Sequence, residues 1–309
     1  MANTVGRGFP PGPWVLVVGM HRSGTSALAG VLGRLGLMLP APDDLVVGRY
    51  DNPVHNESKA LTDVDDEILA ALGGTWSAPP VVAPGWERSD AVLGVTGRVP
   101  GAARRAFPVD GPVVWKDPRL CLLLPLWRSL LPAPVATVLL WRAPLAVARS
   151  LGSRQGFSVS LGLALWERYN RDALAGLAGG AVFVMRYEGL LDDPRASVTA
   201  LARWLTATGH VPVTADESAI SAAVSSVSEA LARHEGEGEL PEVLNRAVST
   251  MTDLTGGHDR LPGTPTEVPP PWMADAIAQR RDYEDLYARY MRYVRLRRRI
   301  PFVGGRGRR

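Results

Sequence analysis

The stretch WVLVVGMHRSGTSALAGVLGRLGL, residues 14–37, decides the fold. Its opening WVLVVG is a continuous apolar run, which is typical of a strand buried on both faces of a parallel sheet. From Thr25 onward the apolar residues recur at helical spacing, and Gly19 and Gly24 bound the loop between. A strand, a glycine loop and a helix in this order direct backbone N–H groups and the positive end of a helix dipole to one point. The stretch therefore predicts a binding site for an oxyanion.

The loop departs from the pattern of nucleoside-triphosphate enzymes in an informative way. Its two glycines match G-x-x-x-x-G-K-[ST], but Thr25 stands at the lysine position and Arg22 lies inside the loop. A P-loop kinase would need that lysine and a magnesium ion, with an acidic residue after a neighbouring strand, where this chain has Arg142. A phosphosulfate donor fits better, because a sulfuryl group carries less charge and Arg22 alone could stabilise it. A glycine turn that only connects strand and helix is the third interpretation.

Three further apolar runs predict strands, at residues 112–116, 135–141 and 181–186. Helical patterns separate them, and this alternation indicates a doubly wound sheet. Residues 51–74 predict a loop followed by a helix that ends at a glycine pair. We therefore expect an α/β protein, a P-loop-type three-layer fold with a central parallel sheet and a helical C-terminal extension.

The chain divides by composition into parts that belong to one expected domain and its two flanks. The expected parts are a flexible leader (1–13), a single domain (14–296) made of a core (14–206) and a variable lid with a helical extension (207–296), and a basic tail (297–309). Residues 234–271 are expected to contain much loop or mobile lid. Beyond Trp272 apolar residues fall at helix-like intervals, and we expect this row to pack into the core: Ala276, Tyr283, Leu286, Tyr287, Tyr290 and Val294.

Composition narrows the class of protein. With 309 residues, of which 46% are hydrophobic, the chain can bury a sizeable core. Cys121 is the only cysteine, so no intrachain disulfide forms and a reducing compartment suits the chain. The amino terminus lacks the apolar core of a signal peptide, and the apolar run after it is too short to span a bilayer. We expect a soluble cytoplasmic protein with no nucleic-acid partner, its arginine-rich tail a solvated terminus; the oligomeric state cannot be read.

Two motifs together resemble a known family. GMHRSGTS, residues 19–26, resembles the 5′-phosphosulfate loop of bacterial sulfotransferases that use 3′-phosphoadenosine 5′-phosphosulfate (PAPS), in the branch with an Arg-Ser-Gly-Thr core, similar to tyrosylprotein and carbohydrate sulfotransferases. The second signature of that family, an arginine at a strand end with a serine eight residues later, is present as Arg142 and Ser150. The resemblance implies that these two bind the 3′-phosphate and that no metal is required. It also implies that the loop binds the nucleotide through His21, Arg22, Ser23, Gly24, Thr25 and Ser26.

The expected catalytic groups follow from the same resemblance. VVWKDPRL resembles the Lys-Asp-Pro-Arg segment of bacterial relatives, which implies that Lys116 stabilises the leaving group beside Arg22, while Asp117 and Arg119 pair or shape the loop. DNPVHNES is similar to the segment that supplies the base, with Glu57 the first choice and His55 the second. The plainer interpretations are a surface strand end for the lysine and a carboxylate beside a helix dipole for the glutamate.

The last motif, FVMRYEGLLDDP, resembles the family's Tyr-Glu-Asp-Leu segment and implies that Tyr187 lines the adenine pocket; a core tyrosine is the alternative. The resemblance covers residues 14–206, and the family's C-terminal glycine-rich motif is not evident. It implies transfer of a sulfuryl group from PAPS to a hydroxyl or amine of a small-molecule or carbohydrate acceptor whose identity the sequence does not give. A P-loop kinase using ATP and Mg²⁺ and a non-catalytic nucleotide-binding protein are the rivals.

Overall fold

The computed structural model describes most of the chain. The described residues are 9–47, 54–132, 135–209, 211–227, 236–265 and 267–298. Most of the predicted leader and of the predicted basic tail therefore lies outside the described residues.

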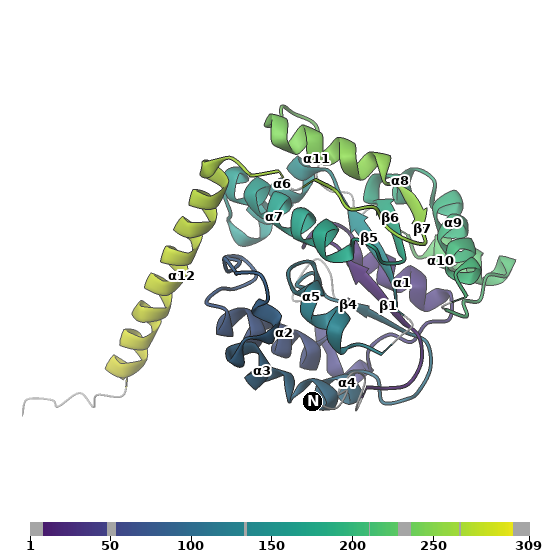
Figure 1. Cartoon of the computed structure of the whole chain (residues 1–309), viewed down its shortest axis with the longest axis horizontal. Coiled ribbons are helices and arrows are strands. Elements are labelled where there is room, and N and C mark those ends of the chain that lie inside the picture. Colours follow the sequence, from purple (N-terminus) through teal and green to yellow (C-terminus); the bar gives the residue numbers. More distant parts are fainter. Residues whose placement is uncertain are drawn as a thin grey trace, which may run out of the picture.

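The central sheet has five strands in the order β4-β1-β5-β6-β7 (Figure 1). The strands are β1 (Trp14–Val18), β4 (Val113–Lys116), β5 (Val135–Trp141), β6 (Val182–Arg186) and β7 (Gly256–His258). The first four are mutually parallel along the sheet, which confirms the predicted parallel core, and β7 runs antiparallel to β6. Because parallel strands end at the same edge, the segments after β1, β4, β5 and β6 meet there.

Helices cover both faces of this sheet. They are α1 (Thr25–Arg34), α2 (Lys59–Ala71), α3 (Asp90–Thr96), α4 (Val99–Ala106), α5 (Leu120–Leu130), α6 (Pro144–Gln155), α7 (Val159–Leu177), α8 (Tyr187–Asp192), α9 (Pro194–Ala207), α10 (Glu217–Ser225), α11 (Glu242–Asp253) and α12 (Pro271–Arg298). Along β1, Leu16 packs in one core with α2, α5 and α7, whereas Val17 packs in the other with α1, α9 and α10. Successive side chains of a strand point to opposite faces, so a strand covered on both sides must be apolar throughout.

The segment before α2 differs from the prediction of a loop. Residues 54–58 form β3 (Val54–Ser58), which pairs antiparallel with β2 (Leu45–Val47). The predicted helix then begins at Lys59, because the Ser58 hydroxyl caps it by accepting from the Leu61 N–H at 3.1 Å. This hairpin carries two of the predicted site residues to the edge of the sheet.

Residues 234–271, expected to contain much loop or mobile lid, also contain regular elements in their described part. Helix α11 lies there and buries Val243, Leu244 and Met251, and β7 follows it. A Cβ on Gly257 would lie 2.2 Å from the Trp204 ring, so a side chain at this point of β7 is incompatible with the packing. A glycine strand has no alternation of apolar and polar residues, which is why the pattern did not reveal it.

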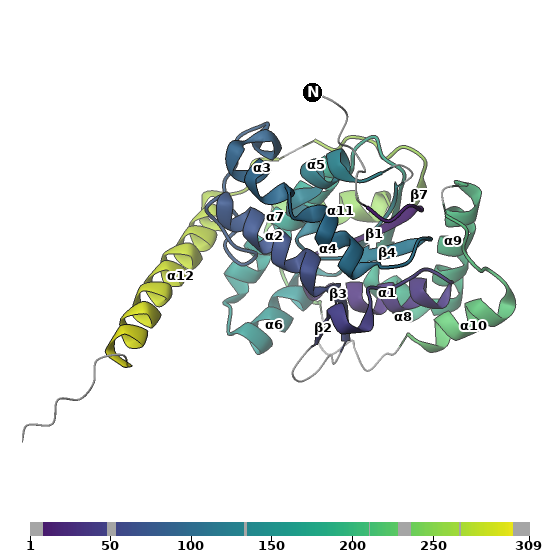
Figure 2. The same cartoon turned by 90° about the horizontal axis from the view of Figure 1, so that it is seen from below.

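The apolar row of α12 is exposed, contrary to the expectation that it would pack into the core. The helix is attached to α7 near its start, where Met273 and Ile277 are buried. Figures 1 and 2 both show the rest of α12, in yellow, running away from the body. The exposed fractions are 56% for Tyr283, 67% for Leu286, 54% for Tyr287 and 58% for Tyr290. The spacing of apolar residues predicted the helix correctly, but it carries no information on which part of the helix packs against other elements.

Candidate functional site

The glycine loop between β1 and α1 is shaped by close contacts. Gly24 has a φ of 87°, and a Cβ there would lie 2.2 Å from carbons of the Tyr187 ring. A Cβ on Gly19 would lie 2.3 Å from the Leu140 carbonyl oxygen of β5. Both glycines of the motif are thus required by close neighbours, one in α8 and one in β5, and the N–H groups that open α1 face the loop.

Two residues of this region other than glycine have a left-handed backbone. Arg22 has a φ of 70° and Asn56 of β3 a φ of 54°, and they are the non-glycine residues with positive φ among those that the structure describes. The Asn56 amide donates to the Ser26 carbonyl at 2.9 Å, and the Ser26 hydroxyl donates to the His55 carbonyl at 2.9 Å. The hairpin and the loop are therefore joined by two reciprocal hydrogen bonds.

A cavity of about 880 Å³ lies over the loop and contains almost the whole predicted site. Every predicted site residue lines it except Ser23, whose hydroxyl is buried without a hydrogen-bond partner among the described residues. The predicted residues that line it are His21, Arg22, Gly24, Thr25, Ser26, His55, Glu57, Lys116, Arg142, Ser150 and Tyr187. Segments far apart in sequence meet here because they follow the parallel strands or belong to the hairpin beside them.

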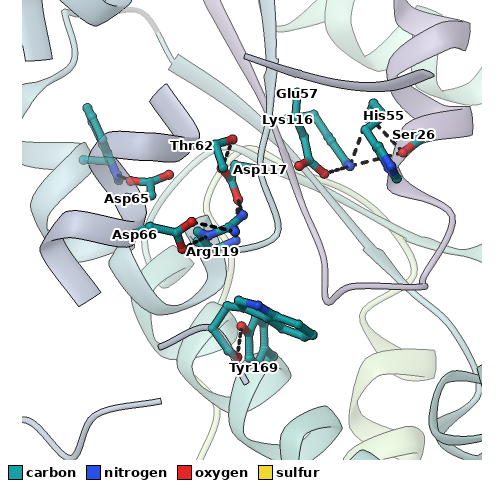
Figure 3. Close-up of polar contacts among 12 residues, drawn as sticks. Ser26, His55, Glu57, Thr62, Asp65, Asp66, Lys116, Asp117, Arg119 and Tyr169 are labelled. Carbon is teal, nitrogen blue, oxygen red and sulfur yellow. Dashed lines mark hydrogen bonds and ion pairs between the residues drawn. The ribbon is translucent and has the colours of Figure 1, made fainter. Parts of the chain in front are cut away.

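Lys116 lies at the centre of one half of the cavity. Its ammonium group donates to the Ser26 hydroxyl at 3.1 Å, to the His55 carbonyl at 3.2 Å and to the Glu57 carboxylate (Figure 3). The Lys116 side chain is 3% exposed, so it is not a surface strand end. Burial raises the pKa of Glu57 above its ordinary value, although the Lys116 cation opposes that effect. A buried lysine and a buried carboxyl group thus share one point of the loop.

The two arginines of the predicted signatures meet in the other half. Arg22 donates through Nε to the Ser150 hydroxyl at 2.9 Å, and Arg142 donates to the Arg22 carbonyl at 3.3 Å. Arg142 follows β5, and Ser150 lies two turns into α6. Both are buried, at 6% and 2% exposure. The spacing of eight residues therefore places a guanidinium and a hydroxyl on one side of the loop.

Tyr187 lies at the boundary between the core and the cavity. Its side chain is 2% exposed and belongs to the core beneath α1, and its ring also lines the cavity. The Arg142 guanidinium lies 5.1 Å from the ring centre, within the range of a cation–π contact. The ring therefore supports the loop at Gly24 and orients one cation of the cavity.

The cavity is strongly cationic. Five side chains with full positive charge line it, namely Arg22, Lys116, Arg119, Arg142 and Arg154. Glu57 is the carboxylate among its described lining residues. Burial lowers the pKa of His21 well below its ordinary value, and the cations of Arg119, Lys116 and Arg22 lower it further, so this imidazole is neutral. Such a cavity is suited to a ligand with several negative charges.

A second polar network fixes the segment after β4. The Asp117 carboxylate accepts from the Arg119 N–H at 2.8 Å, from its guanidinium at 3.1 Å and from the Thr62 hydroxyl at 3.0 Å (Figure 3). Arg119 also donates two hydrogen bonds to Asp66, at 2.6 and 3.1 Å. The predicted pairing of Asp117 with Arg119 is confirmed, and it ties the segment after Lys116 to α2.

Sequence reasoning missed the aromatic residues that pack against His21 of the loop. Trp76 packs 4.4 Å from the His21 ring and stacks 5.8 Å from Phe157, measured between ring centres, and its carbonyl accepts from the Tyr169 hydroxyl at 2.6 Å. A smaller cavity of about 440 Å³ shares Trp76 and Gln155 with the main cavity. No sequence motif identifies Trp76, a tryptophan next to a proline-rich loop, as a site residue. Arg154, by contrast, was detectable, because it lies one helical turn beyond Ser150.

Neither a metal site nor a membrane span is found in the part of the chain that the structure describes. No group of three or more His, Cys, Asp or Glu residues in the described ranges is arranged to hold a metal ion. Among the described helices, none is long and apolar enough to cross a bilayer.

Comparisons with known proteins give a similarity of fold. The sequence matches no model of a known protein family and no curated protein. Among solved structures, the chain is similar to the sulfotransferase domain from the curacin biosynthetic pathway, with 15% identity over 79% of this chain and 98% of that one and a TM-score of 0.47. It is also similar to the sulfotransferase domain of the Synechococcus PCC 7002 olefin synthase, with 19% identity over 79% and 94% of the two chains and a TM-score of 0.46. These similarities concern the fold alone.

Proposed function

We propose that the chain is a PAPS-dependent sulfotransferase that transfers a sulfuryl group to a hydroxyl or amine of a small-molecule or carbohydrate acceptor. The observation that carries this proposal is the contact of Arg22 with Ser150, two residues 128 positions apart that belong to separate anion-binding motifs. A single cationic cavity with two such motifs suits a nucleotide that carries phosphate groups at two positions of its ribose. A nucleoside triphosphate has its phosphates in one chain and leaves the second motif without a role.

Each half of the cavity then has its part in binding. The loop N–H groups and Arg22 bind the 5′-phosphosulfate, because oxyanions are favoured where a helix begins. Arg142 and Ser150 bind the 3′-phosphate, for which a planar guanidinium offers two parallel donors. Tyr187 supports the glycine loop and lines the wall beside the adenine of the nucleotide. On nucleotide binding, Ser150 exchanges its contact with Arg22 for one with the phosphate.

The transfer itself uses the Lys116 and Glu57 pair. The acceptor oxygen or nitrogen attacks sulfur, and the new bond forms as the bond between sulfur and the bridging oxygen of the donor breaks. Glu57 takes the acceptor's proton, for which it must be ionised and released from Lys116. Lys116 turns to the bridging oxygen, where it and Arg22 stabilise the electron pair left on 3′-phosphoadenosine 5′-phosphate (PAP). His55, half-buried in the same wall, is the second choice for the base.

The acceptor belongs in the smaller cavity. This cavity opens beside Trp76 and Gln155, which it shares with the main cavity, and its wall includes Phe157 and the carboxylates of Asp66 and Glu284. Aromatic rings with nearby carboxylate oxygens suit a compact acceptor that carries several hydroxyl groups. Its volume of about 440 Å³ admits a small molecule or one end of a larger one.

The first test is binding of nucleotides to the purified protein, read as thermal stabilisation. PAP, 5′-AMP and ATP with Mg²⁺ are each compared with and without EDTA. A ligand that binds the native state alone stabilises it by about 2.7 kcal/mol at a hundred times its dissociation constant. We expect a shift with PAP that survives EDTA and exceeds the shift with AMP. A shift with ATP that needs Mg²⁺, and none with PAP, would instead favour the kinase.

A matched pair of variants tests the second phosphate site. Arg142→Ala should remove the preference for PAP over AMP, because only PAP has the 3′-phosphate. Arg149→Ala is the control, since Arg149 also lies on α6 but is exposed and does not line the cavity. Equal loss in both variants would contradict the assignment. Turnover of PAPS with an acceptor then separates an enzyme from a protein that only binds the nucleotide.

A further inference from the structure

The outer part of α12 extends away from the other described helices and strands (Figure 1). The first half of the helix is held by buried apolar side chains, and at its middle Glu284 accepts hydrogen bonds from Thr75 and Ser77. From Asp285 to Arg298 the described side chains are almost all exposed, over a length of about 21 Å. Isolated helices of about 12 to 15 residues are marginal in water, and most helices are stabilised by packing of an apolar face.

This outer part has such a face. Tyr283, Leu286 and Tyr290 are spaced by three and four residues and therefore lie in one row, with Tyr287 beside them. Each is more than half exposed, and Tyr283 and Tyr287 stack on each other with ring centres 6.3 Å apart. Contiguous apolar surface of this kind marks an interaction site on a water-exposed element.

A charged row next to it indicates what the face binds. Asp282, Asp285, Arg289 and Arg292 follow one another at three, four and three residues, so they lie in a row adjoining the apolar one. The acidic pair precedes the basic pair. An antiparallel copy of the same helix, related by a two-fold axis, would place acidic residues beside basic ones at both ends, whereas in a parallel two-fold pair the row would face the opposite flank of the partner helix and would not meet the partner's row. The row is thus complementary to itself under a two-fold rotation, as a symmetric homodimer requires.

We propose that α12 is a self-association surface on which a second copy of this chain packs its own α12 antiparallel, with the tyrosine and leucine rows in contact and the two charged rows complementary. A contact between helix halves of this length buries less than the roughly 1,200 to 2,000 Å² of a standard interface. The dimer therefore forms reversibly with protein concentration. The proposal does not depend on the enzyme activity.

The test is the mass of the full chain in solution, measured by sedimentation from about 1 to about 100 μM, a range chosen for an interface of this size. The wild type should change from monomer to dimer across the range. The variant Asp282→Arg/Asp285→Arg has a wholly basic row and should stay monomeric, as should Arg289→Asp/Arg292→Asp, whose row is wholly acidic. An equimolar mixture of the two should form a dimer, and the chain with all four changes should regain self-association.

Controls separate this occupant from others. All four substituted side chains are exposed, so circular dichroism and nucleotide binding should be unchanged in each variant. A monomeric wild type at all concentrations overturns the proposal, and so does a dimer that both charge variants leave unaffected. A chain that ends at Arg298 tests the segment 299–309 as the occupant. If that shortened chain dimerises while the full chain is monomeric, the segment covers the face and the proposal is wrong.

Discussion

Substituting Gly24 by alanine tests the packing that builds the loop. The residue has a φ of 87°, and a left-handed conformation costs a residue with a Cβ about 1 to 2 kcal/mol. The added Cβ would lie 2.2 Å from Tyr187 ring carbons, about 1 Å inside the 3.4 Å of ordinary contact. The ring cannot withdraw freely, because it is buried and lies beside the Arg142 guanidinium. Such overpacking costs about 1 to 3 kcal/mol, so the two effects together predict a loss of about 2 to 5 kcal/mol.

Gly30→Ala on α1 is the matched control. Its Cβ would meet only the Asn56 amide, at 3.8 Å, and alanine is favoured over glycine inside a helix by about 0.5 to 1 kcal/mol. Denaturant unfolding gives the two free energies, and titration with PAP gives the affinities. Gly24→Ala should unfold more easily and bind PAP more weakly, whereas Gly30→Ala should match or exceed the wild type in stability. Equal stability and equal PAP affinity in the two variants would refute the contact between Gly24 and Tyr187.

Three further predictions concern ionisation and the acceptor wall. Because burial raises the pKa of Glu57, and a base must be ionised, kcat/KM should fall as pH drops through a value above the ordinary carboxyl range. Glu57→Gln should abolish this fall of kcat/KM at low pH and lower the rate about 10²- to 10⁴-fold while PAP affinity is kept. Normal turnover of the variant would move the role of base to His55. Burial, with the Asp117 charge, raises the pKa of Asp65 well above its ordinary value, so its contribution to stability falls as pH rises from the ordinary carboxyl range through the raised pKa. Asp65→Asn keeps an oxygen that accepts from the Trp127 N–H. Its free energy of unfolding, measured with urea, should exceed that of the wild type by about 1 to 3 kcal/mol at about pH 8. An equal increase at about pH 4 would argue against ionisation of Asp65 as the cause. Trp76→Ala should raise KM for the acceptor roughly tenfold, about 1.4 kcal/mol, without changing PAP affinity. Val81→Ala is the control, because Val81 is 84% exposed, and it should change neither quantity. A fall in PAP affinity with Trp76→Ala would mean that Trp76 belongs to the nucleotide site.

The parallel core could be predicted from the sequence because its signal is local. Each strand of the parallel set is an apolar run, and the topology of such sheets brings the segments after the strands to one edge. This is why residues named from motifs in four separate segments, such as Arg22 and Lys116, line one cavity. The roles assigned to them stay predictions.

The remaining parts depend on contacts between distant residues. Strand β7 has a glycine at position 257 because a side chain there would clash with Trp204, and glycine has no pattern to read. Trp76 belongs to the site because Tyr169 and Glu284, from two distant helices, hold its loop in place. The exposure of Tyr290 depends on which part of α12 packs against other elements, and the spacing of apolar residues does not indicate this.

The left-handed backbone at Arg22 and Asn56 has a consequence for how stability is distributed. Sparsely populated backbone conformations of this kind cost of order 1 to 3 kcal/mol each and persist only where the surrounding structure enforces them. Both residues line the cavity over the glycine loop, so strain is concentrated in the part of the fold that forms the candidate site. Glycine at either position would relax the chain but remove the side chain that faces the cavity. Selection for relaxed backbone alone would therefore favour glycine at these two positions, and it would remove side chains on which the nucleotide binding proposed above depends.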